Sequence, residues 1–220
     1  MNGFGRQLRY DISQVLGVVL VGILFNSSFV LAEESIPLEK LVVTKEKTFI
    51  INKKTYEVEV RILPDKHNQD KIGAAKTSFT LGVTTPNYYS NNKTARIVKL
   101  QGKVHWLLTI QTAYGKGQSP KTPSAYGRGT TEADLKSANV LLGFHEYCHR
   151  QDYIEYIKTR GLTDFGIKRG ILVAKYKQLT EPKRLNAIAT TLTEKMDIYS
   201  TEKTDEVGSV KRSDFLKRNE

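Results

Sequence analysis

The sequence predicts an α+β fold in which a small, mostly antiparallel sheet precedes a helical half. Apolar residues alternate with polar ones from Leu38 to about Thr112, and from Thr131 onward they recur with a period of about 3.6. The segment between these halves is rich in Gly, Pro, Ser and Thr. With 39% hydrophobic and 26% charged residues, the 220-residue chain is neither collagen-like nor wholly disordered.

Residues 1–32 have the pattern of a cleavable secretory signal. Arg6 and Arg9 precede the uncharged run Val15–Phe25, and small residues lead to a cleavage site after Ala32. The apolar run is shorter than the roughly 17–25 residues that cross a bilayer. We therefore expect a secreted or periplasmic protein whose mature part follows this segment.

The mature part is expected to be basic and free of disulfides. The whole chain carries 34 Lys and Arg against 23 Asp and Glu, which gives a formal charge of +11. Such an excess serves either solubility or electrostatic contact with an anionic cell envelope. Because the basic residues are dispersed along the sequence, solubility is the simpler interpretation. Cys148 is the one cysteine in the sequence and has no partner for a disulfide.

The strand-rich half covers residues 33–112. Its β-rich or alternating segments are separated by turn-forming Pro, Asn and Gly residues, and alternation of this kind is typical of strands with one buried face. The expected strands lie at residues 41–43, 48–51, 55–62, 79–83, 96–100 and 104–112.

A loop over residues 113–130 links the two halves. Long loops in compact domains often carry function, so this one either borders a substrate groove or simply connects the halves. The helical half, 131–210, opens with Thr131, which is placed to cap a helix three residues before Asp134.

The same half predicts three helices. The first is one long helix over about 131–160, which Gly161 would stop. A shorter helix is expected over residues 167–179, and Pro182 is suited to the first turn of another. Residues 211–220 are expected to form a basic tail.

The first of these helices carries the motif His145-Glu146-Tyr147-Cys148-His149, an H-E-x-x-H pattern. Residues four apart share a helix face, so His145 and His149 can bind one cation from the same side, and zinc suits this pair. Glu146 can face a water at an open coordination position and act as general base. The motif therefore predicts a zinc-dependent hydrolase.

A catalytic zinc needs a third protein ligand, and the motif helix offers a poor one. Asp152 shares the face of His149 but rises past the metal, which suits a supporting partner or a surface charge. Glu155 lies at an offset that some zinc proteases use, but those chains turn at a glycine where this one has Asp152. Asp164 follows the expected helix end and can fold back toward the site.

With its H-E-x-x-H helix, preceding strands and secretory leader, the chain resembles a bacterial family of predicted secreted zinc-dependent proteases, catalogued as a domain of unknown function. The resemblance spans most of residues 48–208 and is most specific at the motif itself. It implies a zincin-like fold, a zinc cofactor and peptidase activity.

A late segment carries the rest of this resemblance and the expected third ligand. The family motif reads approximately Tyr-Asp-x-x-Thr-x-His-Gly. This chain has the matching residues, with small shifts, at Tyr199, Thr204 and Gly208. Ser200 stands in place of the aspartate, and the histidine is missing. Carboxylates occupy its neighbourhood, and two histidines with one carboxylate are an ordinary zinc ligand set. We therefore rank Glu206 first as third ligand, Asp205 second and Asp164 third.

Three further residues have chemistry that the motif does not need. Cys148 lies about 100° around the helix from His149 and is expected to face the core. His105 follows a strand residue and suits a structural role on the sheet. Tyr199 is a candidate donor to the oxyanion of a tetrahedral intermediate, although aromatic packing is the favoured interpretation.

These features predict a secreted or periplasmic zinc metallohydrolase that cleaves peptide bonds. Its expected partner is a peptide or protein substrate, with no nucleic acid. A non-catalytic exported module that binds zinc or envelope polymers is the alternative from another class. A metal-dependent amidase that acts on cell-wall peptides is a third.

Overall fold

The computed structural model describes residues 34–211 together with Asp214 and Lys217, and its class is α+β. The expected signal segment, residues 1–32, and most of the expected tail at 211–220 lie outside the described residues. Within the described part of the chain, no helix is long and apolar enough to span a membrane.

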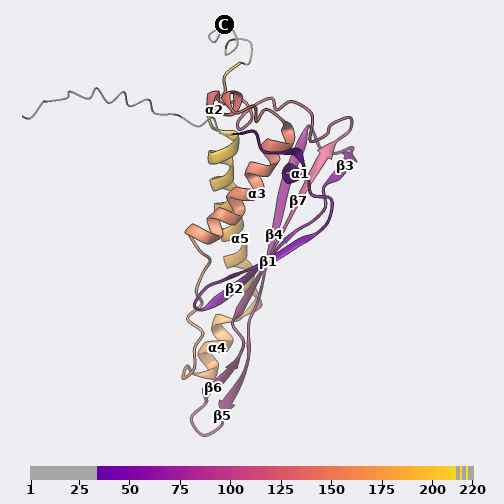
Figure 1. Cartoon of the computed structure of the whole chain (residues 1–220). Coiled ribbons are helices and arrows are strands. Elements are labelled where there is room, and N and C mark those ends of the chain that lie inside the picture. The colour runs from indigo at the N-terminus through magenta and orange to yellow at the C-terminus, as the bar shows by residue number, and fades with distance from the viewer. Residues whose placement is uncertain (1–33, 212–213, 215–216, 218–220) are drawn as a thin grey trace, which may run out of the picture. The chain divides into compact units, whose positions relative to one another are not determined.

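A five-stranded sheet is built around β7 (Val104–Gly115), the longest strand of the sheet (Figure 1). Along one side of β7, β2 (Tyr56–Ile62) and then β3 (Lys66–Gln69) run parallel to it. On its other side β4 (Ala75–Thr84) runs antiparallel. The remaining strand, β1 (Lys47–Asn52), pairs antiparallel with β2.

The expected sheet was mostly antiparallel, whereas the described sheet is mixed, since two of its four pairings are parallel. A parallel pairing requires a long crossover between the two strands. The chain between β2 and β7 supplies it by folding into β3, β4 and a separate hairpin. Alternation in the sequence identifies strands of this kind but carries no information about their partners.

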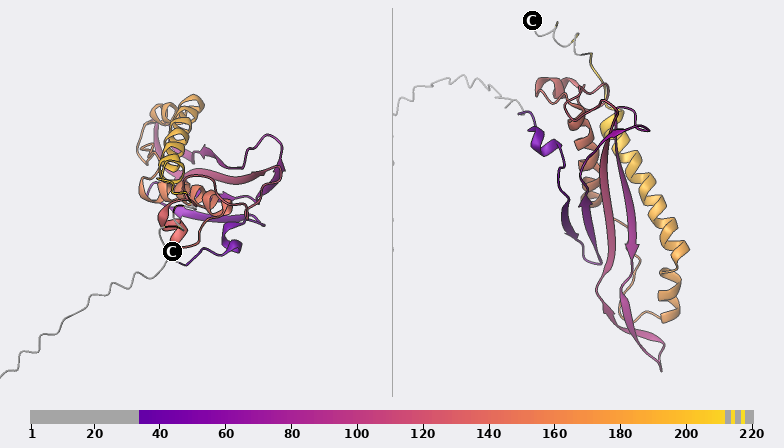
Figure 2. Two further views of the ribbon diagram at one scale, coloured as in Figure 1. Left: turned by 90° about the horizontal axis from the view of Figure 1, so that it is seen from above. Right: turned by 90° about the vertical axis from the view of Figure 1, so that its right-hand side faces the viewer.

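That hairpin is a two-stranded sheet of β5 (Asn87–Asn91) and β6 (Arg96–Gln101), which extends the β4–β7 ribbon. The short helix α4 (Val173–Leu179) packs beside it (Figure 2). An isolated bridge joins Arg96 to Leu172. The helix expected over 167–179 therefore forms only in its second half.

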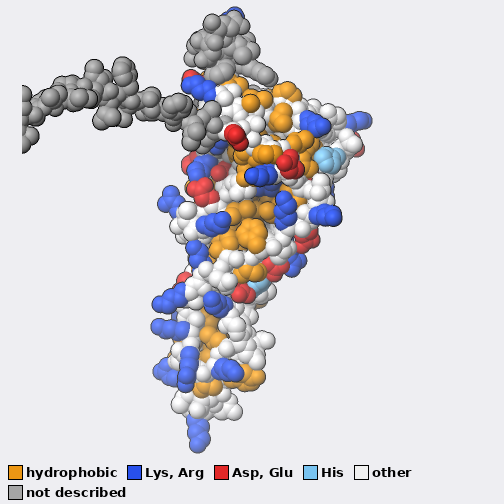
Figure 3. Space-filling model, viewed as in Figure 1, with side chains coloured by type: hydrophobic (Ala, Val, Ile, Leu, Met, Phe, Trp, Pro, Cys, Tyr) orange, Lys and Arg blue, Asp and Glu red, His pale blue; other side chains and the backbone are white. Residues whose placement is uncertain are grey.

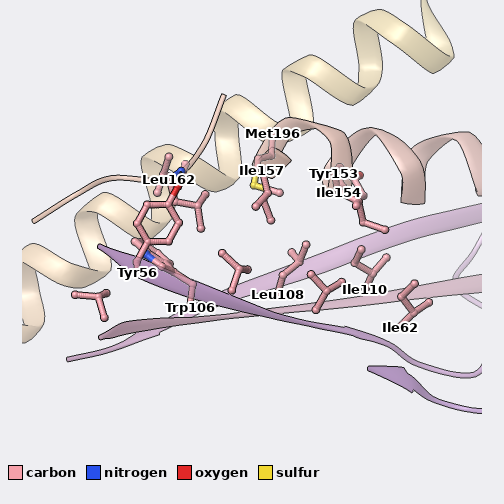
Figure 4. Close-up of a cluster of buried hydrophobic side chains, with 14 of the residues drawn as sticks. Tyr56, Ile62, Trp106, Leu108, Ile110, Tyr153, Ile154, Ile157, Leu162 and Met196 are labelled. Carbon is pink, nitrogen blue, oxygen red and sulfur yellow. Dashed lines mark hydrogen bonds between the residues drawn. The ribbon is translucent and has the colours of Figure 1, made fainter. Parts of the chain in front are cut away.

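Helices α3 (Leu142–Thr159) and α5 (Pro182–Ser200) supply the helical side of the core. Alternate residues of β2 and β7 face them across a buried interface (Figure 4). Trp106 and Leu108 of β7 are fully buried there, as are Ile157 of α3 and Met196 of α5. Burial of side chains of this size stabilises the fold by roughly 1.5–3 kcal/mol each.

The long helix expected over 131–160 is interrupted. A short helix α2 (Glu132–Lys136) comes first, and α3 begins only at Leu142. Between them Ala138 has a positive φ of 56°, which a continuous helix does not allow. The predicted cap is confirmed, since the Asp134 amide donates to Thr131 Oγ1 at 3.1 Å.

A buried arginine, one residue after the H-E-x-x-H motif, anchors α3 to the sheet and to the short helix α1 (Leu38–Leu41). The Arg150 guanidinium donates to Thr112 Oγ1 of β7 at 2.7 Å and to the carbonyl of Leu41. Leu41 ends α1, where the sequence predicted a strand at 41–43. The Asp65 carboxylate lies 3.7 Å from the same guanidinium and balances its charge.

Candidate metal centre

The two motif histidines lie one turn apart on α3 and point at the same place. Their Nε2 atoms are 3.2 Å apart. His145 is buried, and the side chain of His149 is only 12% exposed. This confirms the arrangement expected from their spacing, because α3 is a regular helix through both residues.

The third group comes from the far end of α5. After Ser200 the helix continues as the π-helical turn η1 (Thr201–Asp205), in which the Glu206 amide bonds to the Thr201 carbonyl five residues back. This turn brings Asp205 Oδ1 to 3.1 Å from His145 Nε2 and 3.2 Å from His149 Nε2. Wide turns of this kind frequently occur at functional sites.

The loop expected to border a groove packs directly against η1. Gly127 has a positive φ of 58°, and a Cβ there would lie 2.1 Å from the Thr204 carbonyl oxygen. The next amide, that of Arg128, donates to the same carbonyl at 2.7 Å. Only glycine permits this approach, which places the Arg128 backbone behind the site.

Hydrogen bonds behind the two rings fix their tautomers. His145 Nδ1 lies 3.0 Å from the Arg128 carbonyl, which can only accept, so Nδ1 carries the proton. His149 Nδ1 lies 2.8 Å from Ser200 Oγ, and that hydroxyl donates its own proton to Asp152 Oδ2. Both imidazoles therefore direct the lone pair of Nε2 toward Asp205.

Three acceptor atoms thus face one point with no proton among them. Asp205 Oδ1 is buried and has no hydrogen-bond partner in the described structure. Such an arrangement is repulsive unless a cation occupies the centre. A tetrahedral zinc ion with bonds of about 2.0–2.1 Å separates its ligand atoms by about 3.3 Å. The observed separations of 3.1–3.2 Å fit that ion, and His145, His149 and Asp205 could hold it.

The surroundings of His149 keep its ring neutral, so that it can bind a cation. Burial lowers the pKa of His149 to about 4, although Asp205 acts in the opposite direction. The ring is therefore neutral at pH 7, as a metal ligand must be. Asp152 supports it from behind, since its Oδ2 also accepts from Thr204 Oγ1 at 2.7 Å. Asp152 is a buried supporting partner of His149 and not a surface charge.

Glu146 adjoins this group and opens onto a pocket of about 380 Å³. Its side chain is 2% exposed, and its Oε2 has no hydrogen-bond partner in the described structure. Burial raises the pKa of Glu146, which moves the carboxyl toward the range of a general base. A water in the pocket is the natural partner for that oxygen.

The pocket walls come from several elements. Lys76 and Thr77 belong to the start of β4, which is an edge strand of the described sheet. Tyr126 comes from the loop, and its ring meets that of His145 edge-on at 5.0 Å between centroids. Burial raises the pKa of Tyr126, and the charges of Asp205 and Glu146 add to the shift. The phenol therefore stays protonated and able to donate.

The structure separates the three carboxylates that the sequence ranked. Asp205, ranked second, is the one that meets the histidines. Glu206, ranked first, is exposed just beyond η1 and is not a member of the group. Asp164, ranked third, is exposed in a loop, where it accepts a bond from the Gly166 amide at 2.8 Å.

The other singled-out residues lie outside the candidate metal group. Tyr199 is bonded to Glu155 at 3.1 Å and does not line the pocket. His105 lies on the sheet between Glu57 and Glu59, at 3.2 and 3.3 Å. Cys148 is buried, as expected, and burial raises its pKa to about 12, so the thiol stays protonated.

Sequence reasoning missed the residues that orient the histidines. Ser200 was noted only as a departure from a family motif, yet it links His149 to Asp152. Ser200 and Thr204 are four residues apart, a spacing that places two hydroxyls on one helix face. That spacing was the available signal. The sequence contains no such signal for the Arg128 carbonyl, because every residue has a backbone carbonyl.

No family model, curated protein or solved structure matches this chain. The resemblance to secreted zinc-dependent proteases therefore stays a prediction from the motif and its surroundings.

Proposed function

We propose that this protein is a secreted or periplasmic zinc-dependent peptidase of the zincin-like type. The observation that carries the proposal is the convergence of two Nε2 lone pairs and Asp205 Oδ1, with an unpartnered Glu146 oxygen beside them. Structural zinc sites have four protein ligands, whereas catalytic sites have three and keep one position open. The triad has three members and adjoins a pocket, which favours catalysis over a purely structural metal.

In this proposal the residues at and behind the candidate metal group have separate tasks. A zinc ion held by His145, His149 and Asp205 would polarise a carbonyl and acidify a water. Glu146 accepts the proton of that water and returns it to the leaving amine. Tyr126 donates a hydrogen bond to the oxygen that becomes negative. Ser200 and Asp152 hold the ring of His149 in the required tautomer.

The proposed substrate is an extended peptide segment. Edge strands accept such segments because their outer backbone groups are free to pair. The start of β4 is an edge of the described sheet and lines the pocket beside Glu146. A folded or highly branched substrate would not present a backbone to this edge.

Glu146→Gln tests the proposal. The amide cannot take up a proton, so peptide hydrolysis should fall by about 10²–10⁴-fold. Zinc content should stay unchanged, since Glu146 is not a member of the triad. The measurement pairs cleavage of an unstructured peptide panel with elemental analysis of the purified protein.

Glu155→Gln is the matched control, because Glu155 lies on the same helix but is exposed and paired with Lys203. It should keep full activity. Hydrolysis that survives in Glu146→Gln would refute the assigned base. Inclusion of cell-wall peptides in the panel distinguishes an amidase from a general peptidase.

A further inference from the structure

Two segments of the chain hold most of its excess positive charge. Residues 85–103 carry four Lys or Arg and no Asp or Glu, and residues 166–180 carry the same. Together they contribute +8 to a chain of formal charge +11. We call the body formed by these two segments the basic hairpin unit.

The fold joins the two segments, although they are far apart in the sequence. The Ile97 amide of β6 donates to the Ile171 carbonyl at 2.9 Å, and the Gly170 amide donates back to Ile97 at 2.8 Å. The rings of Tyr88 and Tyr176 pack at 4.6 Å between centroids. Basic residues that are dispersed in sequence are therefore gathered on one structural unit.

The positive charges of this unit are exposed and are not neutralised by described carboxylates. Its eight basic side chains all belong to exposed residues: Lys93, Arg96, Lys99, Lys103, Lys168, Arg169, Lys175 and Lys177. In the part of the chain that the structure describes, none of them forms an ion pair with a carboxylate. Figure 3 shows Lys and Arg over the lower end of the molecule, where β5, β6 and α4 lie.

Apolar side chains lie exposed among these charges. Tyr89 is 54% exposed, Leu172 45% and Val98 42%. Tyr89 lies opposite Lys99 in the hairpin register. Tyrosine and aliphatic side chains next to lysines are the composition that binds at the headgroup level of a membrane. A polyanion without apolar parts, such as polyphosphate, would gain nothing from the exposed apolar groups.

We propose that the basic hairpin unit binds the surface of an anionic phospholipid bilayer. Lys and Arg near such a surface are attracted to its negative potential, and the exposed Tyr89 and Leu172 add apolar contact with the interface. The unit is separate from the metal triad, which lies on α3 and η1. Membrane binding would thus localise the protein without involving the triad.

Vesicle co-sedimentation of the full chain tests this proposal. The probes are phosphatidylcholine vesicles with and without about 30% phosphatidylglycerol, at low and high salt. The wild type should bind the anionic vesicles far more tightly, and salt should weaken that binding. Every variant shares residues 1–32, so this segment contributes equally throughout.

A matched pair of variants isolates the unit. Neutralising Lys93, Lys99, Lys168 and Lys177 to Gln should lower the partition coefficient at least about tenfold. The control neutralises four exposed lysines elsewhere, Lys54, Lys116, Lys121 and Lys158, and should change it less than about twofold. Equal losses in both variants would mean that only net charge matters, and would overturn the proposal.

Tyr89→Ser separates a membrane from a soluble polyanion. It should weaken vesicle binding severalfold and leave binding to polyphosphate unchanged. If the variant binds vesicles like the wild type, or if the wild type binds neutral and anionic vesicles equally, the membrane proposal is wrong.

Discussion

Asp205 Oδ1 and the Nε2 atoms of His145 and His149 form a triangle with sides of 3.1–3.2 Å. Each imidazole carries its proton on Nδ1, where it is donated in a hydrogen bond. His145 Nδ1 donates to the Arg128 carbonyl, and His149 Nδ1 donates to Ser200 Oγ. Three lone pairs that converge in this way are costly without a cation. At the scale of single residues, the metal proposal depends on this arrangement of protons more than on the motif letters.

Ser200→Ala tests the orientation of His149. Without the hydroxyl, His149 Nδ1 loses its acceptor and the link to Asp152 is broken. Zinc affinity should fall by about 10–100-fold, as is usual when such supporting groups are removed. Competition with a chromogenic chelator measures this, and Ser78→Ala on the exposed side of β4 is the control. An unchanged dissociation constant would show that Ser200 does not orient the ligand.

The sequence predicts that His145 and His149 lie on one helix face, but it ranks Glu206 above Asp205, the carboxylate that lies beside them. A spacing of four in a regular helix determines where His149 lies relative to His145. Asp205 and Glu206 are adjacent, and which of them faces inward depends on the local helical pitch. The π-helical turn changes that pitch, and no residue pattern in the sequence announces it.

At the scale of elements, the start of α2 holds the loop that supports His145. The Asp134 carboxylate accepts from Arg128 Nε at 3.1 Å through each of its oxygens and from Arg128 Nη2 at 2.9 Å through Oδ1. Its Oδ2 also accepts from the Gly129 amide at 2.8 Å. The capping pattern predicted Thr131 correctly, but Asp134 is turned toward the loop. The side chain and carbonyl of Arg128 thus link α2 to His145 of the candidate metal centre.

Asp134→Asn should destabilise the fold by about 1.5–3 kcal/mol at pH 7, because it removes charge-assisted hydrogen bonds from a buried site. Urea unfolding in the presence of a chelator measures this without a contribution from metal release. Glu132→Gln, in an exposed pair with Lys136, should change the free energy of unfolding by less than about 0.5 kcal/mol.

The stability difference between the wild type and Asp134→Asn should depend on pH, and the sign of that dependence follows from the pKa of Asp134. Burial alone would raise the pKa of Asp134, but bonds from Arg128, Thr131 and Gly129 hold it below the ordinary value of 3.8. A depressed pKa stabilises the folded state above the unfolded value, and this contribution is lost as pH falls through the folded value. The difference between wild type and Asp134→Asn should stay constant from pH 5 to pH 8, within about 0.5 kcal/mol, and shrink below about pH 4. A difference that grows on acidification would contradict this.

At the scale of the whole molecule, the features that the sequence did not predict depend on contacts between segments that are far apart in the chain. The α+β class followed from the change of period at Thr131. The parallel pairing of β2 with β7 depends on a crossover that local alternation does not record. The gathering of charge on the basic hairpin unit has the same origin, since residues 85–103 and 166–180 meet only in the fold.

Zinc stoichiometry in matched variants tests the central claim most directly. Purified wild type should carry about one zinc per chain, or regain it on dialysis against zinc. Asp205→Asn should lose at least about 90% of that zinc under the same dialysis, while the neighbouring Glu206→Gln keeps it. The account is contradicted if the wild type binds no stoichiometric zinc, or if Glu206→Gln loses the metal and Asp205→Asn retains it.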